Sequence, residues 1–166
     1  NGCHVDAHPF HLGVVGYIDD VPEGGGSFSV WPGSHLEFYP TFITRYKRDA
    51  TEQYEPLRAR LNDQAPVDCW GRAGDILFWH HRIGHMAGHN RSRQIRQAVL
   101  YDFVKKEIEE TQDEPPLEDM WLDWSGEVQA AGPSGRTGTE ASLILRPQPF
   151  VRSVMLNPFR IDAILS

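Results

Sequence analysis

Four residues of this chain have the types and spacing of a metal centre with an anion-binding partner. His4 and Asp6 lie one residue apart near the start, His85 lies far downstream, and Arg96 follows eleven positions after that. Two imidazoles and one carboxylate form a facial ligand set for ferrous iron that leaves coordination positions open. A guanidinium matches a dicarboxylate co-substrate because it binds a carboxylate through two parallel charged hydrogen bonds. The pattern therefore favours iron-dependent oxygen chemistry.

The local sequence explains how these side chains would meet. Residues two apart on an extended segment share a face, so His4 and Asp6 can hold one metal ion while Cys3 points to the opposite side. The third ligand must come from one of four downstream histidines, which are His80, His81, His85 and His89. Of His80 and His81, one is expected to face the core or the mouth of the site and the other solvent. Only His85 has an arginine partner, which a hairpin would bring back beside it.

Spacing alone leaves a second interpretation open. The chain has 8 histidines, so a His-x-Asp pattern arises readily by chance. In that case His4 and Asp6 are a hydrogen-bonded surface pair, and His85 is a turn residue with satisfied hydrogen bonds.

Composition excludes several classes of protein. The chain has 166 residues, 40% hydrophobic and 23% charged, which indicates a single globular domain over residues 1–166 with a real core. A net charge of −7 without a basic run argues against nucleic acid as a partner, and no apolar run has the length of a membrane span. Cys3 and Cys69 are expected to be free thiols, which favours a reducing, cytoplasmic location. Because the chain opens at Asn1 inside an apparent active-site segment, we expect that it lacks its N-terminal part.

The pattern of apolar residues and turns predicts a mostly β fold. Strands are expected at residues 11–19, 27–31, 66–70, 75–80 and 95–103, and the second of these should have one buried face. Residues 36–63 instead show helical spacing and predict a helical insertion over the surface. Short strands with Gly-rich turns are typical of a jelly-roll sandwich or barrel. Residues 105–166 are acidic and rich in Pro and Gly, and are expected to form a C-terminal extension that packs on the domain.

The motifs around these residues resemble the phytanoyl-CoA dioxygenase family. The resemblance rests on His4-Val-Asp6, on the Gly-rich turn and Pro-Gly-Ser-His element within residues 17–35, on residues 74–80, and on residues 85–92 followed by Arg96. These pieces occur in the family's order and cover roughly residues 1–104.

The resemblance implies a cupin-like double-stranded β-helix that uses Fe(II), 2-oxoglutarate and O2. It implies that His4, Asp6 and His85 bind iron and that Arg96 pairs with the distal carboxylate of 2-oxoglutarate, which becomes succinate as a substrate is hydroxylated. Asp6 disfavours halogenation, because related halogenases have a small residue in its place. Ala87 departs from the family pattern, in which a small hydroxyl residue often touches the co-substrate. Tyr17 is a candidate to supply that contact, and a core tyrosine is the alternative.

Three further residues are candidates for the substrate pocket, namely His8, His11 and Trp79. For the two histidines, solvent-exposed loop positions are the alternative. A small organic molecule is the expected substrate, while its identity and the oligomeric state stay open. Two other functions remain possible: a jelly-roll module that binds metal without turnover, and a cupin-like metalloenzyme that does not use 2-oxoglutarate.

Overall fold

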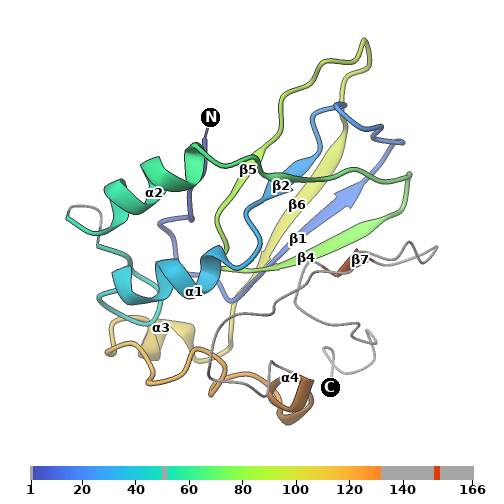
Figure 1. Cartoon of the computed structure of the whole chain (residues 1–166). Helices are drawn as coiled ribbons and strands as arrows, with labels where there is room; N and C mark the ends of the chain where they lie inside the picture. Colours follow the sequence, from blue (N-terminus) through green and yellow to red (C-terminus); the bar gives the residue numbers. More distant parts are fainter. Residues whose placement is uncertain (1, 50–51, 132–151, 154–166) are drawn as a thin grey trace.

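Two β-sheets form the centre of the computed structural model, which describes residues 2–49, 52–131 and 152–153 (Figure 1). The four-stranded sheet has the order β6-β1-β4-β7, and the three-stranded sheet has the order β3-β2-β5. All pairings are antiparallel except that of β7 with β4. The strands are β1 (Leu12–Tyr17), β2 (Phe28–Val30), β3 (Val67–Cys69), β4 (Ile76–His80), β5 (His85–Ala87), β6 (Ala98–Phe103) and β7 (Arg152–Ser153).

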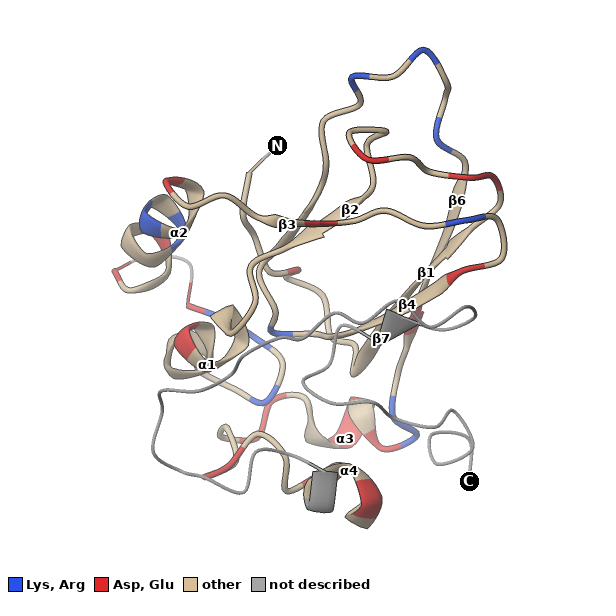
Figure 2. Ribbon diagram, turned by 45° about the vertical axis from the view of Figure 1, so that its right-hand side comes forward, with Lys and Arg blue, Asp and Glu red and all other residues tan. Residues whose placement is uncertain are grey.

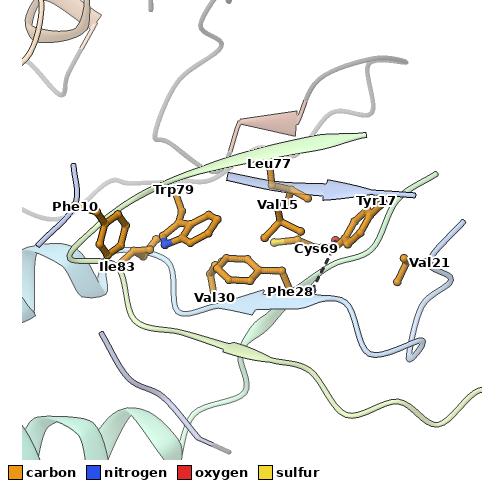
Figure 3. Close-up of a cluster of buried hydrophobic side chains, with 10 residues drawn as sticks. All are labelled: Phe10, Val15, Tyr17, Val21, Phe28, Val30, Cys69, Leu77, Trp79 and Ile83. Carbon is orange, nitrogen blue, oxygen red and sulfur yellow. Dashed lines mark hydrogen bonds between the residues drawn. The ribbon is translucent and has the colours of Figure 1, made fainter. Parts of the chain in front are cut away.

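The main hydrophobic core fills the space between the two sheets (Figure 3). Along β1, Val15 and Tyr17 point inward and are at most 2% exposed, as period-2 alternation requires. Leu77 and Trp79 of β4 lie on the same face and meet side chains of β2 and β3. The predicted β core is therefore present, with strands close to their expected positions.

The strand β2 differs from its prediction, because both of its faces are buried. Phe28 and Val30 enter the main core, while Ser29 on the other face is fully buried and donates to Oδ1 of Asp68 at 2.5 Å. The sequence pattern predicted one buried face since serine is usually exposed. Here a cross-strand carboxylate satisfies the hydroxyl, so its burial costs little.

The insertion at residues 36–63 is partly helical, but it is not only a surface excursion. It contains α1 (Ser34–Phe38), the 3-10 helix η1 (Tyr39–Thr41) and α2 (Tyr54–Asn62). These helices lie to one side of the sheets (Figure 1). Their apolar side chains form a second core with residues of the N-terminal segment and of β5, and the buried members are Cys3, Val5, Trp31, Phe38, Phe42, Tyr54, Leu61 and Met86.

The predicted hairpin between His85 and Arg96 is wrong. The strand β5 pairs with β2, whereas β6 pairs with β1 in the other sheet. The β5–β6 connection carries Arg91, Arg93 and Arg96 and extends away from the sheets (Figures 1 and 2). Its first part is tied to the Gly-rich turn, where Gly25 and Asn90 form an isolated β-bridge.

Part of the C-terminal region, residues 105–131, lies against the domain. It includes α3 (Ile108–Thr111) and α4 (Gly126–Ala131), both of which carry acidic residues (Figure 2). The ring of Trp121 lies 5.2 Å from that of His80 at the end of β4. The rest of the expected extension, apart from β7, lies outside the described residues. Among the described helices, none is long and apolar enough to cross a membrane.

Candidate metal centre

The N-terminal segment and β5 bring His4, Asp6 and His85 together. His4 and His85 exchange two backbone hydrogen bonds, with N···O distances of 3.1 and 2.9 Å, so the segment runs beside β5 as an extra antiparallel chain. Cys3 and Val5 point into the second core and are at most 1% exposed. Alternation therefore turns His4 and Asp6 to the other side, toward the ring of His85.

The three side chains converge on one point, with one ligand atom from each lying within 4.8 Å of the others. Nε2 of His85 is 3.4 Å from Oδ2 of Asp6, and Nε2 of His4 is 3.8 Å from Oδ1 of Asp6. Ligands with bonds of roughly 2.1 Å at right angles would be about 3 Å apart, so a small closure is sufficient. The side chains of His4 and Asp6 are 41% and 26% exposed, against 7% for His85, so one side of the group is open.

Backbone carbonyls orient both imidazoles in the same way. Nδ1 of His4 lies 2.9 Å from the carbonyl oxygen of Gly2, and Nδ1 of His85 lies 2.9 Å from that of Ile83. A carbonyl only accepts, so each Nδ1 carries the proton and each Nε2 keeps a lone pair. Both lone pairs belong to the nitrogens that face Asp6. This is the arrangement that metal-binding histidines usually show.

The protonation states suit a cation. Burial lowers the pKa of His4, although its bond to Gly2 opposes the shift. Burial acts to raise the pKa of Asp6, but the neighbouring imidazoles, that of His85 above all, outweigh it, and the pKa is lowered. Near neutral pH the group therefore offers one anionic oxygen ligand and a neutral His4, the forms that bind a metal ion. The donor set fits Fe(II), for which two imidazoles and one carboxylate are a common facial arrangement.

Arg96 and Tyr17 lie near each other at one end of β6. The N–H of Ile18 donates to the carbonyl of Gln97 at 3.1 Å, which continues the β1–β6 ladder almost to Arg96. Arg96 is half-buried and acts electrostatically on Tyr17, whose pKa is raised to about 12 mainly by burial. The Tyr17 hydroxyl donates to the Cys69 carbonyl at 2.6 Å and accepts from the N–H of Phe28 at 3.0 Å. Because the hydroxyl of Tyr17 has only one proton and donates it to Cys69, it cannot also donate to a co-substrate carboxylate. The geometry therefore favours the alternative that Tyr17 is a core residue.

The three predicted pocket residues occupy different surroundings. His8 is exposed, and its Nε2 lies 2.8 Å from Oδ2 of Asp102. Trp79 is a core residue whose ring centroid lies 5.7 Å from that of His85, so it packs against this candidate ligand on the side of the core. His11 is buried, with its ring 4.2 Å from that of Trp124.

His11 belongs to a second histidine cluster that the sequence did not predict. Its members His35, His80 and His81 are also buried, so the expectation that His80 or His81 faces solvent is wrong. Neighbouring rings lie 4.5–6.0 Å apart, and residues 105–131 cover them through Trp121 and Trp124. Beside His81 is a small cavity of about 10 Å³, lined by Arg45, Tyr46, His81, Arg82, Leu117, Met120 and Asp123.

Asp102 is a further residue that sequence reasoning missed. It is the one charged residue of β6, whose other residues are Ala, Val, Leu, Tyr and Phe. Its contact with His8 joins β6 to the segment that carries His4 and Asp6.

A comparison with protein families shows which family the chain belongs to. A model of the phytanoyl-CoA dioxygenase (PhyH) family matches residues 3–98, more than half of the chain. The chain belongs to this family. Members of the phytanoyl-CoA dioxygenase family are non-haem iron oxygenases that depend on Fe(II) and 2-oxoglutarate and act on small molecules. The match contains His4, Asp6, His85 and Arg96.

A solved structure is also similar to this chain, namely the non-haem alpha-ketoglutarate-dependent carbocyclase SnoK from nogalamycin biosynthesis. The two share 24% identity with a TM-score of 0.45, over 71% of this chain and 53% of SnoK. The chain thus spans about half the length of that protein. A search of curated proteins found no match.

Proposed function

We propose that this protein is an Fe(II)- and 2-oxoglutarate-dependent dioxygenase that hydroxylates a small organic substrate. In this proposal His4, Asp6 and His85 bind the iron, and Arg96 binds the distal carboxylate of 2-oxoglutarate. Bound Fe(II) would supply oxygen activation, coupled to decarboxylation of 2-oxoglutarate to succinate. Residues 1–166 would form a single oxygenase domain of the double-stranded β-helix type.

The observation that carries the proposal is the matched orientation of the two imidazoles around Asp6. Each Nδ1–H is held by the carbonyl two residues earlier in the chain, so each Nε2 lone pair is presented beside the carboxylate. A histidine pair that served only structure would have no need to leave both inner nitrogens without a proton. With three protein ligands and an exposed side, coordination positions remain for a chelating keto acid and for oxygen.

The other residues have supporting roles. Arg96 lies just beyond the end of the β1–β6 ladder, near Tyr17, and makes no ion pair with the described residues, so its guanidinium is available for a carboxylate. Trp79 packs against His85 and excludes water from that side of the group. His8 is proposed to line the substrate side, since it lies two residues after Asp6 and is exposed.

Anaerobic addition of Fe(II) and 2-oxoglutarate tests this function. We expect the weak visible charge-transfer band of an iron–keto acid chelate, and release of succinate once oxygen and a substrate are supplied. His4→Ala and Asp6→Ala should abolish both signals. A band that forms with Fe(II) but is indifferent to 2-oxoglutarate would favour a cupin-like metalloenzyme, and metal binding without open positions would favour a non-catalytic module.

A further inference from the structure

The inner face of β6 borders an open side of the space between the sheets. Ala98 packs against the main core, so Leu100 and Asp102, at two-residue intervals, point to the same side. Leu100 is nevertheless 59% exposed, although its neighbour Val15 on β1 is completely buried. Within the described residues, this stretch of the inner face is therefore accessible to a ligand.

The strand register places Asp102 on the same row as a neighbour of the candidate metal centre. Gly13 of β1 pairs with Asp102 on one side and with Trp79 on the other. Adjacent strands are about 4.8 Å apart, so the backbones of Trp79 and Asp102 are separated by roughly 10 Å. The indole lies across the position of Gly13 and contacts His85. Asp102 therefore faces the region next to the three candidate ligands.

His8 connects Asp102 to that region. It lies two residues after Asp6, within electrostatic range of its carboxylate, and its ring stacks on Phe10 with a centroid distance of 5.0 Å. The side chains of His8 and Asp102 are 56% and 33% exposed. A surface ion pair of this exposure adds little to stability, so stability alone does not account for an acid on the inner face of β6.

The hydrogen-bonding capacity of the pair indicates what it would recognise. A carboxylate only accepts, so Nε2 of His8 carries the proton in the 2.8 Å contact with Oδ2 of Asp102. Oδ1 of Asp102 makes no hydrogen bond with the described residues. The pair thus presents an anionic acceptor, the free oxygen of Asp102, beside the apolar side chain of Leu100.

We propose that Asp102 and His8 form a recognition subsite for a substrate that carries a hydrogen-bond donor, an ammonium group above all, on an apolar chain that contacts Leu100. This inference rests on the proposed function, because it assigns the substrate side of the same iron site. A charge-assisted hydrogen bond to Asp102 would favour ammonium over hydroxyl and disfavour carboxylate.

Three simple probes of equal chain length test the subsite: hexylamine, hexan-1-ol and hexanoate. Each is titrated into the anaerobic protein with Fe(II) and 2-oxoglutarate at neutral pH, and the change in the charge-transfer band is followed. We expect hexylamine to perturb the band at a concentration at least tenfold lower than hexanoate, with hexan-1-ol between them. Asp102→Asn keeps the size of the side chain but removes its charge, and should abolish the preference. His8→Gln should reduce it, and Asp19→Asn, at an exposed position in the turn after β1, should leave it unchanged.

The outcomes separate this inference from the proposed function. If the band forms but all three probes perturb it equally, or if Asp102→Asn retains the preference, the subsite is refuted while the function stands. If Asp102→Asn retains the preference, the amine binds iron directly and not through Asp102. If the wild-type protein forms no band at all, the function itself is refuted and the subsite falls with it.

Discussion

Gly13→Ala should disturb the packing behind the candidate metal centre. A Cβ atom added at Gly13 would lie 2.1–2.6 Å from three ring carbons of Trp79, whereas ordinary contacts begin at 3.4 Å. Both partners are fixed, since Gly13 lies between two paired strands and Trp79 is 2% exposed. The indole must therefore move by more than about 1 Å. The rings of Phe10, Phe28 and His85 already pack around it, so they must move as well.

The size of the effect follows from two opposing contributions. Inserting a methyl group into a packed core typically costs about 1–3 kcal/mol of the free energy of unfolding. Replacing glycine by alanine also reduces the conformational entropy of the unfolded chain, which stabilises the folded protein by about 0.4–1 kcal/mol. Gly16→Ala is the matched control on the same strand, because nothing lies within 4 Å of its added Cβ. It should be neutral or slightly stabilising, so the two variants should differ by about 2 kcal/mol.

Urea denaturation followed by tryptophan fluorescence measures this difference, and titration with Fe(II) and 2-oxoglutarate measures the effect on the site. We expect Gly13→Ala to lower the denaturation midpoint and to weaken Fe(II) binding through the displaced His85 ring, and Gly16→Ala to do neither. Equal stability of the two variants would show that Trp79 does not lie across Gly13, and would refute the register from which Asp102 is placed.

Three other outcomes are expected. Burial lowers the pKa of His35 from 6.5 to about 4, so the unfolded chain takes up a proton in this window and the folded chain does not. His35 should therefore contribute a fall in stability of about 2 kcal/mol between pH 7 and pH 5, in addition to what the other buried histidines contribute. His35→Leu should remove this share of the loss in urea titrations at the two pH values. Arg96→Lys should weaken 2-oxoglutarate binding at least about tenfold and leave the Fe(II) affinity unchanged, because lysine cannot form two parallel hydrogen bonds with a carboxylate. Arg93→Lys, in the same loop, should bind 2-oxoglutarate as the wild type does. Equal affinities of the two variants would exclude Arg96 as the carboxylate partner. Trp124→Ala should lower the free energy of unfolding by about 2 kcal/mol, because its ring packs on the histidine cluster. Leu122→Ala should change it little, because Leu122 is 54% exposed. Similar losses in the two variants, measured by urea denaturation, would contradict the packing of residues 105–131.

Local patterns predicted much of the β core. Alternation along β1 and β4 identified strands that lie within a few residues of their expected bounds, and it also predicted that Cys3 faces away from His4 and Asp6. These inferences succeeded because side-chain direction along an extended chain depends only on near neighbours. The candidate ligands were named from spacing and resemblance, and their role in metal binding remains a prediction.

Long-range pairing was beyond the sequence patterns. The strands β5 and β6 are neighbours in sequence, but they lie in different sheets, where β5 pairs with β2 and β6 pairs with β1. Ser29, and one of the pair His80 and His81, were expected to be exposed, but all three are buried. Their burial depends on Asp68 and on residues 105–131, which lie far away in the sequence. Contacts between segments far apart in the chain decide such cases.

Anaerobic calorimetric titration with Fe(II) tests the central claim most directly. The wild-type protein should bind one Fe(II) per chain, and Asp6→Ala should weaken binding at least about 100-fold, since the variant loses the only anionic ligand among His4, Asp6 and His85. Asp19→Ala, which removes an exposed carboxylate elsewhere, should bind as the wild type does. Equal Fe(II) affinity of the wild type and Asp6→Ala would contradict the assignment of the metal centre to these three residues.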